Sequence, residues 1–138
     1  AVFEELPGPL VGHGERIMVI EDDPDVREMT TATLEMLGYE VINGGDGLEA
    51  LKIGYGQDEG IDLLLTDVVL PFGNSGPDLA EALSKKWQQM KVLMMTGYAR
   101  DDILRSTDDE RKHPLIQKPF RTVDLSKQIR DMLADRRS

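Results

Sequence analysis

Acidic, hydroxyl and amine side chains that together suit phosphoryl chemistry follow four separate apolar runs of this 138-residue sequence. They are Glu21, Asp22 and Asp23 after the first run, Asp67 after the second, Thr96 after the third and Lys118 after the fourth. Carboxylate oxygens suit a hard cation such as Mg²⁺, and a carboxylate can also be the nucleophile that forms an acyl phosphate. A hydroxyl group and an ammonium group can hold the phosphoryl oxygens. The residue types therefore predict a site that binds a divalent cation and handles phosphate.

Each of these residues also has a purely structural interpretation. The adjacent acids can form a solvated turn, and Asp23 beside Pro24 is typical of a helix N-cap. Asp67 can end a strand, Thr96 can be an ordinary β-branched strand residue, and Lys118 can lie on the surface, as most lysines do. The functional interpretation gains weight only if the apolar runs are neighbouring strands of one sheet.

Short apolar runs alternate with helical patterns along the chain. The predicted strands are residues 17–20, 39–43, 61–66, 92–95 and 115–117, and the predicted helices are residues 24–37, 47–53, 77–87 and 123–133, with a short further helix before the fifth strand. Strands that alternate with helices imply a parallel sheet with right-handed crossovers. Ligands bind at the carboxyl ends of the strands in such sheets, so the acids, the threonine and the lysine would meet there.

The first predicted helix has a regular apolar pattern. Val26, Met29, Thr33, Leu34 and Leu37 recur at helical spacing. Gly38 is expected to end this helix.

Composition limits the kind of protein and its partners. The hydrophobic content of 40% is enough for one core, and no apolar stretch approaches the roughly 18 residues that span a bilayer. Cysteine is absent, which excludes disulfides and thiolate metal sites. A formal net charge of −10 disfavours nucleic acid and anionic membrane surfaces as partners. We expect a cytoplasmic location, with or without a tether to a membrane sensor in a longer protein.

The Pro- and Gly-containing start of the chain predicts its domain organisation. Residues 1–15 are expected to be a flexible linker or tether, residues 16–135 a single domain, and residues 136–138 a tail. A first residue of Ala1 rather than Met predicts a chain that is processed or excised from something longer.

The motifs around the candidate residues resemble those of response-regulator receiver domains over about residues 16–135. They are Ile-Met-Val-Ile-Glu-Asp-Asp-Pro, Leu-Leu-Thr-Asp-Val-Val-Leu-Pro, Ser-Gly-Pro-Asp-Leu-Ala, Met-Met-Thr-Gly-Tyr-Ala and Gln-Lys-Pro-Phe. The resemblance implies an α/β fold: a flavodoxin-like doubly wound sheet of five parallel strands, order 2-1-3-4-5, with helices on both faces.

The resemblance also implies a metal ion and a partner. Mg²⁺ would be bound directly by Asp22, by Asp67 and by the backbone carbonyl of Val69, and through water by Glu21. The phosphoryl group would come from a histidine on a partner histidine kinase or histidine phosphotransfer domain. Such a domain catalyses its own phosphorylation and dephosphorylation.

Further roles implied by the resemblance concern the phosphoryl group itself. Asp67 would be the phosphoacceptor. Thr96 would hydrogen-bond to the phosphoryl group and move inward on activation. Lys118 would pair with a phosphoryl oxygen, and the bond between Lys118 and Pro119 would be cis.

The sequence departs from the receiver pattern in two places. Leu115 stands where many receivers have an aromatic switch residue, three positions before the lysine, and Tyr98 is a hypothetical substitute. The segment Arg105–Lys112 is polar, although the face to which it belongs often makes dimers in this family. We therefore expect weak homodimerisation or none.

Several larger interpretations remain open. The lead-in Gly12–Ile17 resembles the joint before a receiver fused to a histidine kinase, which favours a hybrid sensor kinase over a fragment of a transcription factor. The alternatives are a free-standing single-domain response regulator and a pseudo-receiver that binds protein without carrying phosphate. A magnesium-dependent phosphatase is disfavoured, because such enzymes need a second acid just after the nucleophile and Val68 and Val69 follow Asp67.

Overall fold

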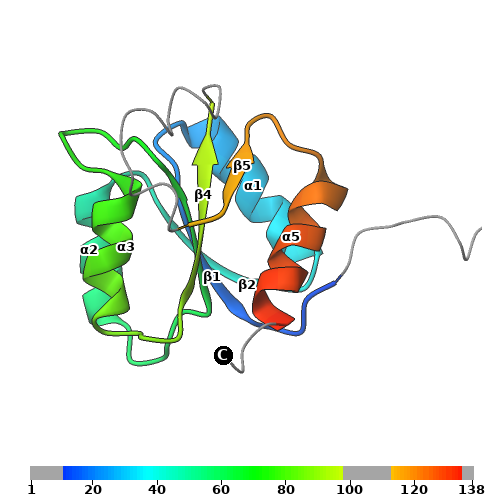
Figure 1. Ribbon diagram of the computed structural model, residues 1–138, viewed down its shortest axis with the longest axis horizontal. Helices are drawn as coiled ribbons and strands as arrows, with labels where there is room; N and C mark the ends of the chain where they lie inside the picture. The colour runs from blue at the N-terminus through cyan, green and yellow to red at the C-terminus, as the bar shows by residue number, and fades with distance from the viewer. Residues whose placement is uncertain (1–10, 98–112, 135–138) are drawn as a thin grey trace, which may run out of the picture.

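A five-stranded sheet with helices on both faces forms the structure, a computed structural model that describes residues 11–97 and 113–134. The elements are β1 (Arg16–Ile20), α1 (Pro24–Met36), β2 (Glu40–Gly44), α2 (Gly47–Gly56), β3 (Leu63–Asp67), α3 (Gly76–Ser84), β4 (Lys91–Thr96), β5 (Leu115–Gln117) and α5 (Thr122–Ala134). All strand pairs are parallel and the order is β2-β1-β3-β4-β5. Helices α1 and α5 cover one face and α2 and α3 the other (Figure 1). The predicted doubly wound sheet and its strand order are confirmed.

Two buried apolar layers hold the helices to the sheet. Met18 and Ile20 of β1 pack in the layer under α2 and α3, whereas Ile17 and Val19 pack in the layer under α1 and α5. Successive side chains of a strand point to opposite faces, so a strand covered on both faces needs apolar residues at every position. This requirement explains the continuous apolar runs of the sequence.

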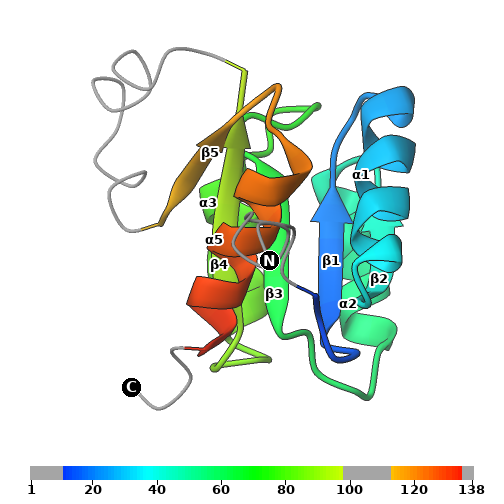
Figure 2. The same ribbon diagram turned by 90° about the vertical axis from the view of Figure 1, so that its right-hand side faces the viewer.

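The parallel register aligns the strand ends. Ile20 at the end of β1 pairs with Thr66, and the next residue of β3, Asp67, pairs with Met95 of β4. Thr96, which ends β4, pairs with Gln117 of β5. Polar residues at or just after these ends therefore share one edge of the sheet, while α5 runs back to the opposite edge (Figure 2).

Helix α1 corrects part of the sequence prediction. Asp23 is its N-cap, as predicted, and its carboxylate accepts hydrogen bonds from the amides of Asp25 at 2.9 Å and Val26 at 3.3 Å. Met29, however, is 65% exposed, and Thr30 is buried instead. Thr30 lies four residues before the buried Leu34 and therefore shares its stripe of the helix.

Two further helix ends differ from the prediction. Helix α2 continues to Gly56 rather than ending at residue 53, and α3 ends at Ser84 rather than at residue 87. Beyond Ser84 the backbone passes into turns, in which the Leu83 carbonyl accepts from the amides of both Lys86 and Trp87. The predicted short helix before β5 falls in residues 98–112, outside the described residues. No helix in the described part of the chain is long and apolar enough to cross a membrane.

Candidate acid site at the carboxyl edge of the sheet

The ends of four strands bring the predicted polar residues to one edge. Glu21 and Asp22 follow β1 directly, Asp67 and Thr96 end β3 and β4, and Lys118 follows β5. We call these five residues the acid site. The predicted meeting of residues far apart in the sequence is therefore present in the structure.

Lys118 joins two of the acids. Its Nζ donates hydrogen bonds to Glu21 Oε1 at 2.7 Å and to Asp67 Oδ1 at 2.8 Å. Glu21 and Asp67 are buried, whereas the Lys118 side chain is 25% exposed. The peptide bond between Lys118 and Pro119 is cis, as the resemblance implied. The ammonium group thus neutralises one of two buried carboxylates and reaches the edge of the site.

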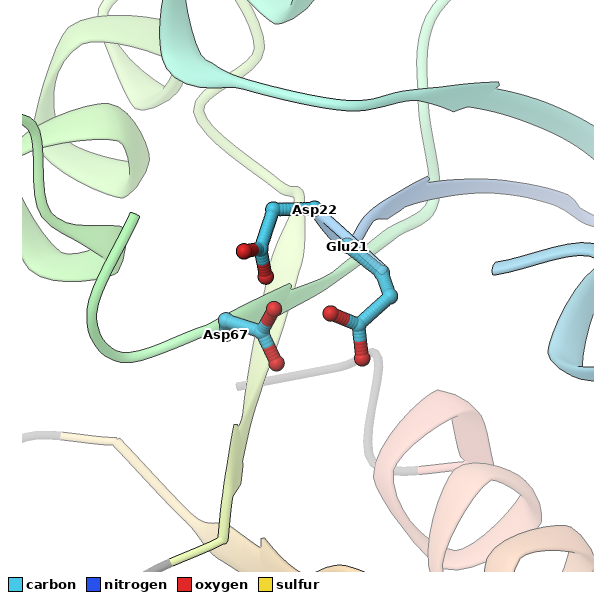
Figure 3. A group of neighbouring side chains, drawn as sticks. All are labelled: Glu21, Asp22 and Asp67. Atoms are coloured by element: carbon cyan, nitrogen blue, oxygen red, sulfur yellow. The ribbon is translucent and has the colours of Figure 1, made fainter. Parts of the chain in front are cut away.

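Three carboxylates converge in the acid site. Figure 3 shows the side chains of Glu21, Asp22 and Asp67 pointing toward one another, and one oxygen from each lies within 4.8 Å of the others. Asp67 Oδ2 is buried and makes no hydrogen bond with any described residue. Oxygen ligands in this number suit a hard divalent cation, which would also satisfy the unpaired oxygen. The residues present therefore fit Mg²⁺.

The charges of the acid site shift the pKa values of its members in opposite directions. Burial and the neighbouring Glu21 carboxylate raise the pKa of Asp67 to about 8, against the opposing effect of Lys118. Burial by itself raises the pKa of Glu21, but contacts with Asp67 and Lys118 lower it to about 2. Burial by itself lowers the pKa of Lys118, but hydrogen bonds to the two acids raise it. One ammonium cannot neutralise two carboxylates, so without a metal ion the pair favours binding one proton.

A cavity of about 320 Å³ opens beside the acids. Its lining consists of Asp22, Asp67, Val68, Val69, Met95, Thr96, Gly97 and Lys118. Thr96 is 3% exposed, and its carbonyl accepts a hydrogen bond from the Lys118 amide at 2.7 Å. A small ligand in this cavity would lie beside the acids, the threonine and the lysine.

The loop between β3 and α3 holds Val69 at the rim of this cavity. Val69 and Ser75 form an isolated antiparallel bridge, and the Gly76 amide donates to the Val68 carbonyl at 2.7 Å. A Cβ atom at Gly76 would collide with the carbonyl oxygen of Asp67, so only glycine permits this close approach. The start of α3 is thereby packed against the end of β3.

Sequence reasoning missed one cation beside the acid site. Arg27, in the first half of α1, donates from Nη1 to the backbone carbonyl of Glu21 at 2.8 Å. Its guanidinium group also lies against Gly45, after β2. The only local signal was a basic residue shortly after an acidic helix start, a pattern too common to mark a site. Arg27 fixes the turn that carries Glu21 and Asp22.

Leu115, at the predicted switch position, is an ordinary core residue. Leu115 is buried at the start of β5 and packs in the apolar layer under α2 and α3. Tyr98, its hypothetical substitute, lies outside the described residues. The structure therefore leaves the substitution as a hypothesis.

Known proteins resemble this chain in sequence and in fold. Residues 17–130 match the response regulator receiver domain family. The chain is 34% identical over 122 residues to the response regulator receiver protein CpdR of Brucella abortus, covering 86% of this chain and 97% of CpdR. It is 31% identical over 117 residues to the sensor kinase CckA of the same organism, covering 85% of this chain but only 12% of CckA.

A solved structure extends the likeness to three dimensions. The response regulator TrrA of Thermotoga maritima, crystallised with Mg²⁺ and BeF, is 28% identical and superposes with a TM-score of 0.72. The match covers 86% of this chain and 98% of TrrA. The likeness thus spans nearly a whole receiver structure.

Proposed function

The chain belongs to the response regulator receiver domain family, and from that premise we propose that Asp67 accepts a phosphoryl group from a phosphohistidine in a two-component phosphorelay. The observation that carries this proposal is the setting of Asp67. Its Oδ1 accepts from Lys118, whereas its buried Oδ2 makes no hydrogen bond within the described residues. Asp67 also lines the cavity at the edge of the sheet. A carboxylate that lines the cavity, with one oxygen left for Mg²⁺ and the other held by Lys118 only until a phosphoryl group arrives, can act as the nucleophile toward phosphorus.

In the proposed transfer, covalent bonds to phosphorus change only between the donor imidazole and the carboxylate. An oxygen of Asp67 forms a bond to phosphorus while the P–N bond to the donor imidazole breaks. The imidazole nitrogen keeps the electron pair of that bond and takes up a proton, and Asp67 becomes an acyl phosphate. Later attack by water returns the carboxylate and inorganic phosphate. The chain would act as a switch that is modified and reset, not as a catalyst for a metabolite.

We assign the Mg²⁺ ligands to the residues around the cavity. Asp22, Asp67 and the backbone carbonyl of Val69 would bind the ion directly, and Glu21 would bind it through water. Bound there, Mg²⁺ supplies positive charge between the acids and the phosphoryl oxygens. The convergence of the three carboxylates and the Mg²⁺–BeF complex of TrrA support this assignment.

Thr96 and Lys118 complete the proposed machinery. The Lys118 ammonium would exchange its hydrogen bond to the Asp67 carboxylate for one to a phosphoryl oxygen, because the phosphoryl group carries more negative charge. The Thr96 hydroxyl would donate to another phosphoryl oxygen and move inward. With Leu115 at the switch position, this movement would lack an aromatic partner at that site.

The setting of the domain in its parent protein has two candidates. Similarity to a short stretch of the sensor kinase CckA favours a receiver within a hybrid histidine kinase. Similarity to CpdR over nearly its whole length favours the alternative, a free-standing regulator. In either case the proposed partner is a histidine kinase or a histidine phosphotransfer domain in the cytoplasm.

The mass of the intact chain tests the proposed acceptor. We expect incubation with acetyl phosphate and Mg²⁺ to add one phosphoryl group to the parent and to an Asp58→Asn control, whose exposed acid lies in a loop. An Asp67→Asn variant should gain nothing. A phosphoryl group added to the Asp67→Asn variant would show that another residue is the acceptor.

Failure of every form to gain mass separates the remaining alternatives. A histidine-phosphorylated kinase would then be supplied as donor. Transfer from it would keep Asp67 as acceptor with a strict need for protein, and no transfer would favour a pseudo-receiver. Hydrolysis of a general phosphatase substrate by the parent would favour a phosphatase.

A further inference from the structure

The residues that lead into β1 are bound to the domain. Gly12 donates from its amide to the Leu37 carbonyl at 2.6 Å, and Gly14 donates to the Gly38 carbonyl at 2.8 Å. We call residues 11–15 the lead-in segment. It lies at the edge of the sheet opposite to the acid site, beside the end of α5 (Figure 2).

Close packing fixes the path of the lead-in segment. A Cβ atom at Gly12 would collide with the ring of Tyr39, which is itself buried. Gly38 has a φ of 101°, and a Cβ there would lie 2.9 Å from the Gly12 carbonyl oxygen. Glycines at both positions therefore allow two backbone segments to touch where side chains would hold them apart.

A partly buried ion pair ties the lead-in segment to α5. Arg130 Nη1 lies 2.5 Å from Glu15 Oε2, and the other carboxylate oxygen accepts from the His13 amide at 2.6 Å. The two side chains are only 21% and 12% exposed. Although burial by itself raises the pKa of Glu15, the bonds from Arg130 and His13 lower it to about 2. The pair is therefore charged throughout the neutral range.

Helix α5 connects this ion pair to the acid site. The helix begins at Thr122, soon after Lys118, and Arg130 lies about two turns further along. Leu125, Ile129 and Leu133 are fully or almost fully buried on one stripe of α5. A helix packed in this way moves as one body, so a displacement of its first turn also displaces Arg130.

We propose that the lead-in segment responds to the state of the acid site, because α5 links Lys118 at one edge of the sheet to the Arg130–Glu15 pair at the other. This inference rests on the proposed function. When Lys118 exchanges a carboxylate for a phosphoryl oxygen, α5 shifts and the bonds that hold residues 12 and 14 change in strength. Phosphorylation at the acid site would thereby change how tightly the chain that precedes β1 is held to the domain.

Hydrogen exchange of the whole 138-residue chain, followed by NMR, tests the link. Beryllofluoride with Mg²⁺ would serve as the phosphoryl analogue. In the parent we expect the amide exchange rates of Gly12 and Gly14 to change at least about fivefold, the lower end of typical couplings between sites. In an Arg130→Gln variant these rates should be the same with and without the analogue.

A matched control lies directly before the same helix. Arg121 is exposed and pairs with Asp124 in the first turn of α5, so Arg121→Gln should keep the full response. Should Arg130→Gln fail to fold, Glu15→Gln breaks the same pair from the other side. A full response in either of these two variants would overturn the role of the ion pair.

The resonances of Asp67 and Lys118 separate the two possible failures. No change there on adding the analogue would contradict the proposed function, and the link with it. A change there with constant exchange rates at Gly12 and Gly14 would overturn the link alone.

Discussion

At the scale of single residues, the acid site combines two buried carboxylates with one ammonium group. Lys118 contacts both Glu21 and Asp67, so one negative charge remains without a partner in a buried place. The folded protein without metal therefore carries a cost that binding of a proton or a cation can remove. Such a cost is expected where binding, rather than stability, has shaped the residues.

Asp67→Asn should stabilise the metal-free protein at high pH. The pKa of Asp67 is raised from 3.8 to about 8, so its bound proton contributes stability that is fully present below pH 3.8 and lost as the pH rises toward 8. The amide has no charge to bury. At pH 8 the variant should therefore be more stable by roughly 1 to 3 kcal/mol, and this gap should narrow toward pH 4.

Urea unfolding in EDTA across this pH range measures the effect. Asp58→Asn, which changes an exposed acid, should follow the parent at every pH. If Asp67→Asn lost stability with rising pH as steeply as the parent, the raised pKa of Asp67 would be wrong.

The convergence of the site residues was predictable from the sequence only as far as local pattern reaches. Glu21, Asp22, Asp67, Thr96 and Lys118 each end or follow an apolar run, and the rules of parallel sheets bring such ends together. Arg27 has no such marker, because its contact with the Glu21 carbonyl depends on how α1 turns back over β1.

At the scale of elements, the C-terminal end of α2 is capped by the side chain of a lysine that follows α3. Lys86 Nζ donates to the carbonyls of Gly54 at 2.9 Å, Tyr55 at 3.3 Å and Gln57 at 2.7 Å. Gly54 and Tyr55 lie in the last turn of α2 and Gln57 directly follows it, where helix carbonyls lack a full set of partners within the helix and positive charge is favoured. A sequence window around α2 does not contain Lys86, which explains why the predicted helix ended too early.

Lys86→Met should therefore loosen the contact between α2 and α3. We expect a loss of about 1 kcal/mol in the free energy of unfolding, because a charged donor to three carbonyls is removed while the aliphatic stem is kept. Lys85→Met is the matched control, since Lys85 is exposed beside it. Denaturant unfolding of both variants measures the effect. Equal losses in the free energy of unfolding would show that Lys86 does not cap α2.

The buried face of α1 could be only partly predicted. Met29 and Thr30 both fit a helical spacing with later apolar residues, and hydrophobicity alone selected Met29. The rotation of α1 on the sheet, set by burial of Leu34 and Leu37, decides in favour of Thr30. Tertiary packing thus overrides the local pattern at this position.

At the scale of the whole molecule, the charge of −10 bears on self-association. Chains of like charge repel one another, and the resemblance places the polar segment Arg105–Lys112 on the face that makes dimers in many receivers. We therefore predict a monomer at tens of micromolar protein, with or without Mg²⁺ and beryllofluoride. Sedimentation velocity at physiological salt measures this, and a tight dimer formed only with the analogue would contradict it.

The fold itself was predictable from the sequence because local signals and topology agree. Apolar runs, helix caps and the alternation of elements all favour one doubly wound sheet, and the observed strand order is the predicted one. The predicted domain boundaries at residues 15 and 135 stay a prediction. The pairing of Glu15 with Arg130 was not predictable, since it joins residues 115 positions apart through the packing of α5.

The described chain enters at residue 11 and leaves at residue 134 on the edge of the sheet away from the acid site (Figure 2). For anyone who fixes this protein to a biosensor chip or fuses it to a fluorescent reporter, either end is a usable point of attachment. A surface or a fused protein attached ahead of residue 11 would leave the cavity accessible to the proposed phosphoryl donor. Attachment through the loop between β3 and α3 would instead obstruct the rim of that cavity.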